Sequence, residues 1–159
     1  MTHHRRRNNG TDPSKINETV ELSPAQRYAA FKQTQAKQRT VAAEFARSMP
    51  FELDEFQMQA NDALEAGDNV LVAAPTGAGK TVAADFAIYL AQTRNVKAFY
   101  TTPIKALSNQ KYHDLVDQYG TDKVGLLTGD TSINSEADIV VMTTEVLRNM
   151  LYEHSVTLE

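Results

Sequence analysis

A short turn at residues 74–81 has the composition of a phosphate-binding loop. It reads Ala74-Pro75-Thr76-Gly77-Ala78-Gly79-Lys80-Thr81. In such a turn several backbone N–H groups can converge on one anion, the lysine ammonium adds a full positive charge, and the final hydroxyl can ligate Mg²⁺. These groups together suit a nucleoside triphosphate and its magnesium ion.

The usual pattern, G-x-x-x-x-G-K-[ST], has glycine at the first position, where this chain has Ala74. A match of this kind can also be a glycine-rich surface turn beside an ordinary solvated lysine. The flanking segments favour the phosphate-binding interpretation. Residues 70–73 are apolar, as in a parallel strand buried on both faces. The next segment predicts a helix whose apolar stripe packs against the sheet, and the stripe consists of Ala83, Phe86, Ala87 and Leu90.

Length and composition predict one compact domain with a tail. The 159 residues contain no cysteine, which excludes a disulfide framework and a thiolate metal site. No run approaches the ~18 apolar residues of a membrane span, and no apolar core of a signal peptide follows the basic amino terminus. We therefore expect a cytoplasmic protein with no membrane partner.

Charge is divided unevenly along the chain. Residues 1–50 contain nine Lys and Arg against four Asp and Glu, whereas residues 51–159 contain seven against sixteen. Because the globular part is acidic, a nucleic-acid partner would be held by local donors rather than by a basic field over the whole domain.

Three parts are predicted along the chain. Residues 1–22 are polar and basic without helical or strand periodicity, which predicts a disordered tail. Its arginines could contact phosphates, although a solvated tail is the favoured interpretation of so short a basic run. Residues 23–49 predict one lead-in helix that begins with Ser23 as N-cap and Pro24 at the first helical position. Residues 50–159 form the remaining, globular part.

Residues 51–57 are predicted to lead into a second helix that runs through about Ala66 and is ended by Gly67. Phe56, Ala60, Ala63 and Leu64 form its apolar stripe. Gln57 lies elsewhere on that helix, and its amide could pair with a ring nitrogen and an exocyclic amine of adenine. A glutamine taken alone is more often a surface residue.

Strands alternate with helices through the rest of the chain. Further strands are predicted at residues 97–101, 124–127 and 139–142, and helices follow the first and last of them. This order predicts an α/β fold with a parallel, doubly wound sheet. The helix after residues 97–101 is predicted to begin with Thr102 as N-cap and Pro103 in the first turn, and to end at Gly120. Its inward-facing residues are predicted to be Ile104, Leu107, Leu115 and Tyr119. The loops 74–80, 101–104, 128–132 and 143–145 each follow a predicted strand, so they meet at one edge of the sheet, where open α/β sheets bind ligands.

Hydroxyl groups and helix-start N–H groups are frequent in three of these loops, and such donors suit a phosphodiester backbone. Thr102, Asp130 and Thr144 can equally be ordinary helix caps and turn residues, and this is the favoured interpretation of each one alone. Their predicted position on the same edge as a nucleotide loop favours a nucleic-acid contact.

Several motifs in this order resemble one known family. AAPTGAGKT, FYTTPIKALSNQKY, GLLTGD and VVMTTEVLRNMLY resemble the motifs of superfamily 2 DExH-box helicases, most closely the superkiller-like branch that handles RNA. The resemblance covers about residues 50–152. It implies the first of two RecA-like domains, with a P-loop parallel sheet sandwiched by helices, preceded here by a helical lead-in.

The resemblance also implies roles for individual residues. ATP and Mg²⁺ would be the cofactors, with Lys80 and Thr81 at the β- and γ-phosphates, Thr81 at the metal, and the adenine near Phe51 and Gln57. The loop residues around the phosphates would be Pro75, Thr76, Gly77, Ala78 and Gly79. The nucleic-acid track would comprise Thr102, Pro103, Lys105, Ser108, Asn109, Gln110, Gly129, Asp130, Thr143, Thr144 and Glu145.

The chain departs from the family at its end. Family members continue with an Asp-Glu-x-His motif, a Ser-Ala-Thr-like motif and a second domain, none of which is present in this sequence. The sheet is therefore expected to be incomplete at the carboxyl end, and the chain to bind nucleotide without hydrolysing it. We expect a monomer that binds single-stranded RNA, with DNA left open. The alternatives are another P-loop nucleotide-triphosphatase or a short non-catalytic nucleotide- or RNA-binding module.

Overall fold

The computed structural model describes residues 23–37 and 39–153. The chain divides into two compact units between residues 38 and 39. In the first unit, α1 (Pro24–Lys37) begins as predicted: Ser23 N–H donates to the Gln26 side chain at 2.8 Å, and Gln26 N–H donates to Ser23 Oγ at 3.3 Å. Tyr28 and Phe31 on this helix are exposed. The tail predicted for residues 1–22 lies outside the described residues.

The predicted single helix over residues 23–49 is wrong, because a separate helix α2 (Val41–Ser48) begins in the second unit. Thr40, whose own backbone is extended, caps α2, with its Oγ1 accepting from Ala43 N–H at 3.1 Å. The Glu65 carboxylate accepts from the N–H groups of Val41 and Ala42 at 3.0 and 2.8 Å. These oxygens satisfy donors that a new helix start leaves without intrahelical partners.

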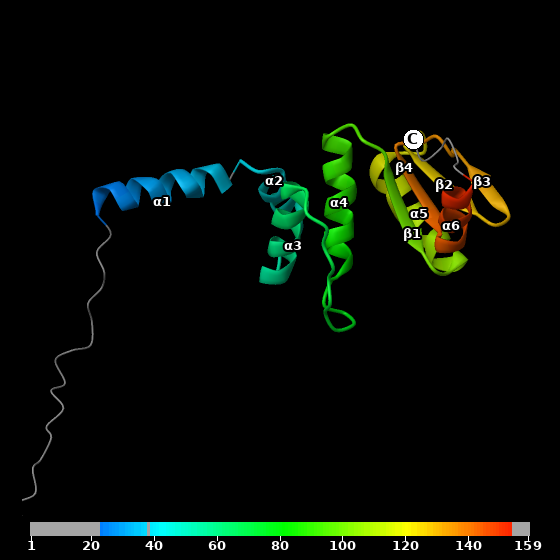
Figure 1. Cartoon of the computed structure of the whole chain (residues 1–159), viewed down its shortest axis with the longest axis horizontal. Helices are drawn as coiled ribbons and strands as arrows, with labels where there is room; N and C mark the ends of the chain where they lie inside the picture. The colour runs from blue at the N-terminus through cyan, green and yellow to red at the C-terminus, as the bar shows by residue number, and fades with distance from the viewer. Residues whose placement is uncertain (1–22, 38, 154–159) are drawn as a thin grey trace, which may run out of the picture. The chain divides into compact units, whose positions relative to one another are not determined.

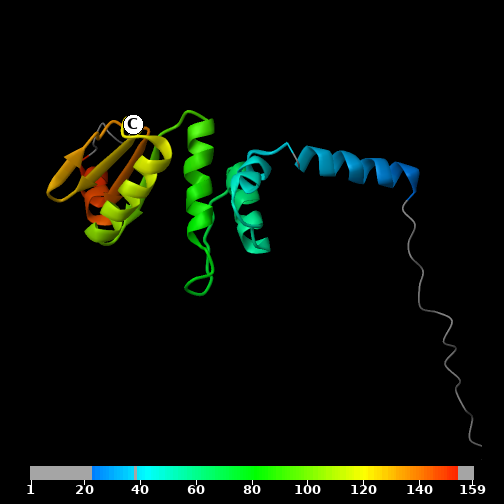
Figure 2. The same ribbon diagram turned by 180° about the vertical axis from the view of Figure 1, so that it is seen from behind.

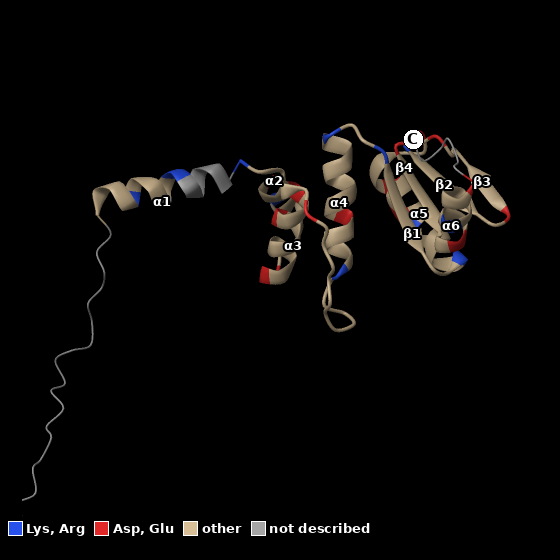
Figure 3. Ribbon diagram, viewed as in Figure 1, with Lys and Arg blue, Asp and Glu red and all other residues tan. Residues whose placement is uncertain are grey.

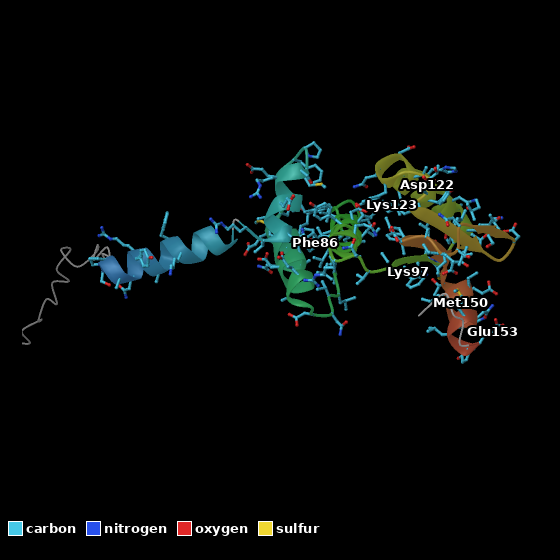
Figure 4. The ribbon with its side chains drawn as sticks, turned by 90° about the horizontal axis from the view of Figure 1, so that it is seen from above. Phe86, Lys97, Asp122, Lys123, Met150 and Glu153 are labelled. Carbon is cyan, nitrogen blue, oxygen red and sulfur yellow. The ribbon has the colours of Figure 1, made fainter. Side chains whose placement is uncertain are left out.

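Two more helices pack with α2, and they are α3 (Glu55–Ala66) and α4 (Thr81–Thr93). Gly67 ends α3 in the left-handed conformation at φ 92°, as predicted. The apolar side of α4 differs from the prediction. Phe86 and Leu90 pack with Phe45 of α2 rather than on the sheet, and the rings of Phe45 and Phe86 are 5.3 Å apart in an edge contact. Figure 4 labels Phe86 within this helical layer.

The sheet contains four strands within the described residues, in the order β1-β4-β2-β3. They are β1 (Ala98–Thr102), β2 (Val124–Thr128), β3 (Thr131–Ile133) and β4 (Ile139–Thr143). β4 pairs in parallel with both β1 and β2, as predicted, whereas β3 pairs antiparallel with β2 in a segment predicted as a loop. Figure 1 shows the four strands side by side.

Helices cover both faces of this sheet. α5 (Lys105–Tyr119) and α6 (Thr144–Tyr152) lie on opposite sides, as the two views in Figures 1 and 2 show. β4 alternates accordingly: Ile139 and Val141 pack in one cluster with Leu115 of α5, and Val140 and Met142 pack in another with Leu147 of α6. Two residues predicted to face inward from α5, Ile104 and Leu107, are exposed instead.

The strand predicted at residues 70–73 is wrong for the described part of the chain. These residues belong to no strand, and Leu71 is 93% exposed. An apolar run becomes a strand only where a neighbour satisfies its backbone N–H and C=O groups. β1 is an edge strand that pairs with β4 on one side, and none of the described strands pairs with residues 70–73.

Acidic and basic residues are interspersed over the described helices and loops (Figure 3), consistent with a chain of 16 Lys and Arg and 20 Asp and Glu. Among the helices that the structure describes, none has the length and apolar character needed to cross a membrane.

Candidate functional site

The phosphate-binding loop lies immediately before α4, so it ends at the positive end of a helix dipole. Gly77 and Gly79 adopt left-handed φ angles of 85° and 74°, which L side chains rarely adopt. The turn is closed by Ala78 N–H donating to the Pro75 carbonyl at 3.2 Å. Thr81, the first residue of α4, is exposed. The glycines thus let the backbone turn at the point where N–H groups are available to an anion.

Lys80 is folded over this loop. Its Nζ donates to the carbonyl oxygens of Ala74 and Pro75 at 2.6 and 2.9 Å. Both partners are neutral, so they hold the ammonium in place without compensating its charge. A lysine held in this way fits a triphosphate, because an anion in the loop would be a stronger partner than either carbonyl.

Gln57 joins the start of α3 to the phosphate loop. Its side chain is buried, Oε1 accepts from Asp54 N–H at 2.8 Å, and Nε2 donates to the Gly79 carbonyl at 3.1 Å. The amide that the sequence suggested for adenine is therefore engaged within the chain at both ends. The hydrogen bond to Gly79 attaches Gln57 to the phosphate-binding loop. If Gln57 contacts a base, the same residue would therefore also support the phosphate site.

A hollow beside Phe51 lies near this end of α3. It has a volume of about 560 Å³ and its apolar lining includes Met49, Phe51, Leu53 and Met58. Phe51 is 51% exposed, so its ring is available to a ligand. Gln57 does not line the hollow.

The segment between β1 and α5 is held by buried hydroxyl groups. Thr102 and Ser108 are buried, their hydroxyl oxygens are 2.7 Å apart, and Thr102 Oγ1 donates to the Ile104 carbonyl at 2.9 Å. The prediction that Thr102 caps this helix and Pro103 opens it is wrong: the cap is Ile104 and the helix begins at Lys105. Thr102 bonds inside the bend instead, and the bend presents Pro103 and Lys105 on the surface.

Lys105 and Asp130 form an ion pair of 2.5 Å above the carboxyl ends of the strands. Lys105 follows β1 and Asp130 follows β2, so the pair crosses the end of β4, which lies between those strands. The hydrogen bond from Lys105 and then that from Thr128 Oγ1, at 2.9 Å, lower the pKa of the exposed Asp130 carboxyl. Both side chains are about half exposed or more, so the pair is accessible to an incoming phosphate.

The remaining predicted track residues lie around this pair. Thr143 is buried as the N-cap position of α6, while Thr144 and Glu145 in the first turn are exposed. Asn109 is half-buried, and Gln110 and Gly129 are exposed. The structure therefore brings together an exposed set after three adjacent strands, and it separates from that set the buried hydroxyls of Thr102, Ser108 and Thr143.

Two features were not predicted from the sequence. The first is the ion pair between Asp85 of α4 and Lys111 of α5. The sequence contained a signal for it, because Asp85 is a single charged residue within an otherwise apolar run. Burial, followed by the charge of Asp85, raises the pKa of Tyr119. The second feature is Asn61 of α3, which is 1% exposed and has no hydrogen-bond partner for its amide oxygen or nitrogen.

The sequence of this chain is similar to those of known helicases. A probable helicase HelY from Mycobacterium leprae is 60% identical over 117 residues, which are 74% of this chain and 13% of that protein. The antiviral helicase SKI2 of Saccharomyces cerevisiae is 55% identical over 107 residues, 67% of this chain and 8% of that protein. The chain thus spans 13% or less of these relatives, and the similarity confirms the expected superkiller-like resemblance.

Solved helicase structures share the fold. A hypothetical ATP-dependent RNA helicase from Sulfolobus tokodaii matches 72% of this chain and 36% of its own, with a TM-score of 0.53 and 27% identity. The DUF1998 helicase MrfA bound to DNA matches 74% of this chain and 18% of its own, with a TM-score of 0.58 and 26% identity. These similarities confirm the predicted RecA-like α/β fold. Residues 54–159 match the DEAD/DEAH box helicase family in sequence, and the chain belongs to that family.

Proposed function

We propose that this chain is the ATP-binding and RNA-binding portion of an ATP-dependent RNA helicase. The observation that carries the proposal is the Lys80 ammonium, held on two carbonyl oxygens above a glycine turn at the start of α4. A full positive charge placed over free N–H groups is a site for the phosphates of a nucleotide.

The residues of the phosphate-binding loop would make different contacts with the nucleotide. Backbone N–H groups of Gly77 and Gly79 would hold the phosphates, joined by Ala78 N–H once it leaves the Pro75 carbonyl. Lys80 would exchange its carbonyl partners for the β- and γ-phosphate oxygens. The exposed Thr81 hydroxyl would ligate Mg²⁺. Bound ATP supplies the phosphoryl group, whereas Phe51 and Gln57 would position its base.

RNA would lie over the carboxyl ends of β1, β4 and β2. Lys105 supplies the cation, and Thr144, Gln110 and the backbone at Gly129 supply exposed donors there. Contacts of this kind fix the position of a phosphodiester backbone without reading its sequence. The buried pair of Thr102 and Ser108 would hold the bend that presents Lys105.

Hydrolysis requires groups that these 159 residues do not supply. The resemblance assigns magnesium and the attacking water to an Asp-Glu-x-His motif, which the sequence lacks. The purified 159-residue chain should therefore bind a fluorescent ATP analogue with Mg²⁺ and show no multiple-turnover ATPase activity.

The test is Lys80→Ala. In the 159-residue chain it should weaken binding of the ATP analogue by at least about tenfold, since charge-assisted bonds to the phosphates are each worth roughly 1.5–3 kcal/mol. In the full-length protein it should abolish RNA-stimulated ATPase activity. Lys97→Ala, directly before β1, is the matched control and should leave both unchanged. Equal nucleotide affinity in wild type and Lys80→Ala would refute the assignment.

The choice of RNA over DNA needs its own measurement. Single-stranded RNA and DNA of the same sequence and length should be compared at one salt concentration, because phosphate contacts make affinity salt-dependent. The proposal expects tighter binding of RNA. Equal or tighter binding of DNA would retain the helicase assignment and exclude the RNA preference.

A further inference from the structure

An ion pair joins the helix that follows the phosphate loop to the helix that follows β1. Lys111 Nζ of α5 is 2.5 Å from Asp85 Oδ1 of α4, and the same ammonium lies 5.3 Å from the centre of the Tyr100 ring in β1. Three elements therefore meet at one cation.

This pair is more enclosed than the other ion pairs among the described residues. The side chains of Lys111 and Asp85 are 17% and 33% exposed, compared with 48% and 66% for Lys105 and Asp130. Ile88, one turn after Asp85, lies in the same buried cluster as Leu115, one turn after Lys111. A salt bridge between half-buried charges is screened less by solvent than a surface pair, so its geometry constrains both helices more strongly.

The position of the pair relates it to both proposed ligand sites. Asp85 is one helical turn after Thr81, where the nucleotide phosphates would bind, and Lys111 directly follows Gln110 in the helix that begins at Lys105. Neither Asp85 nor Lys111 belongs to the proposed nucleotide or RNA contacts. Much of α4 instead packs with α2, through Phe86 and Leu90, so the connection to α5 depends on few groups.

We propose that the Asp85–Lys111 pair, held against Tyr100, couples nucleotide binding to RNA binding by linking the position of α4 to that of α5. The inference rests on the proposed function. A phosphate held at the start of α4 fixes that helix, the ion pair fixes Lys111 relative to it, and α5 then presents Lys105 and Gln110 to RNA. Because coupling is reciprocal, RNA on α5 would favour the nucleotide-bound position of α4 by the same factor.

The experiment measures coupling separately from binding. In the full-length protein, the dissociation constant of a non-hydrolysable ATP analogue with Mg²⁺ is determined without RNA and with saturating single-stranded RNA. The ratio of the two constants is the coupling factor, for which about fivefold or more is expected in the wild type. Asp85→Asn and Lys111→Gln should reduce this factor to near one, while each ligand alone binds within about twofold of wild type.

Conservative variants distinguish coupling from a merely structural role. Asp85→Glu and Lys111→Arg keep the charges and should retain most of the coupling. The double variant Asp85→Asn/Lys111→Gln should lose no more than either single variant, because the two residues act as one unit. Lys97→Met breaks another lysine–carboxylate pair, in which Lys97, directly before β1, lies 3.2 Å from Glu136, and it should leave coupling at the wild-type value; Figure 4 labels Lys97.

The outcomes separate the two proposals. Wild-type protein that binds neither ligand would refute the proposed function. Wild-type protein that binds both ligands with a coupling factor of one, or Asp85→Asn and Lys111→Gln variants with wild-type coupling, would overturn the inference alone. Thermal unfolding of each variant identifies any loss of coupling that comes from loss of the fold.

Discussion

Gln57 Nε2 donates to the Gly79 carbonyl at 3.1 Å, and a Cβ built on Gly79 would lie 2.6 Å from that same nitrogen. Gly79→Ala must therefore displace a buried amide as well as hold alanine at φ 74°. The left-handed conformation costs about 1–2 kcal/mol and loss of the hydrogen bond about 1 kcal/mol more. We expect lower thermal stability and weaker binding of a fluorescent ATP analogue.

Gly77→Ala is the matched control for this prediction. Gly77 has a similar φ of 85°, but a Cβ there would meet nothing within 4 Å. It should lose stability through backbone strain alone, and so less than Gly79→Ala. In a double variant with Gln57→Ala the steric part of the Gly79→Ala effect should vanish. Equal destabilisation by the two glycine variants would show that the Gln57 side chain can move away from the added methyl group without a cost in stability.

Lys105 should contribute one phosphate contact to RNA binding. Its ion pair with Asp130 is exposed, so a phosphate can compete for the ammonium. Lys105→Met should weaken binding of single-stranded RNA and reduce the slope of log K against log salt by about 0.7. Fluorescence anisotropy across a salt series measures that slope. Lys97→Met should leave it unchanged, and an unchanged slope in Lys105→Met would place the RNA elsewhere.

The Asp130 carboxyl should titrate below its ordinary pKa of 3.8, because Lys105 and Thr128 donate hydrogen bonds to its charged form. A lowered folded-state pKa stabilises the fold above pH 3.8, and that contribution is lost as pH falls through the lower value. NMR titration of the Asp130 side-chain carbon measures it directly. Lys105→Met should raise the pKa toward 3.8, whereas Lys97→Met should not.

The three parallel strands and the carboxyl ends of α3 and α5 could be predicted from the sequence because their signals are local. Residues 139–142 form an apolar run between polar segments, and β4 is observed there with both neighbours parallel. Gly67 and Gly120 mark the ends of α3 and α5 as predicted. Such boundaries depend on the conformational freedom of single residues.

Other features depend on partners distant in the sequence. Residues 70–73 have the composition of a buried strand, but composition does not provide a neighbouring strand. The apolar stripe of α4 identifies a buried face without identifying Phe45 as its partner. At the candidate site, Ser108 has the residue type of a phosphate donor, yet its hydroxyl is fully buried against Thr102. The packing around a hydroxyl group determines whether it is exposed to a ligand or hydrogen-bonded within the chain.

Asn61 should be a position where the chain gains stability by substitution. Its amide is 1% exposed and lacks hydrogen-bond partners for both polar atoms, a state that costs about 1–3 kcal/mol. Asn61→Leu has a similar size and no polar atom, so we expect the free energy of unfolding to rise by about 1 kcal/mol. Chemical denaturation with an unchanged m-value would measure the gain.

Ser108→Ala is the contrasting control, because it also removes a fully buried polar group from a helix. The Ser108 hydroxyl is satisfied by Thr102 at 2.7 Å, so its removal should lower the free energy of unfolding by about 1 kcal/mol. The two variants should therefore change stability in opposite directions. Destabilisation by Asn61→Leu would indicate that the Asn61 amide has a water or ligand partner, and the space around it should then be searched for one.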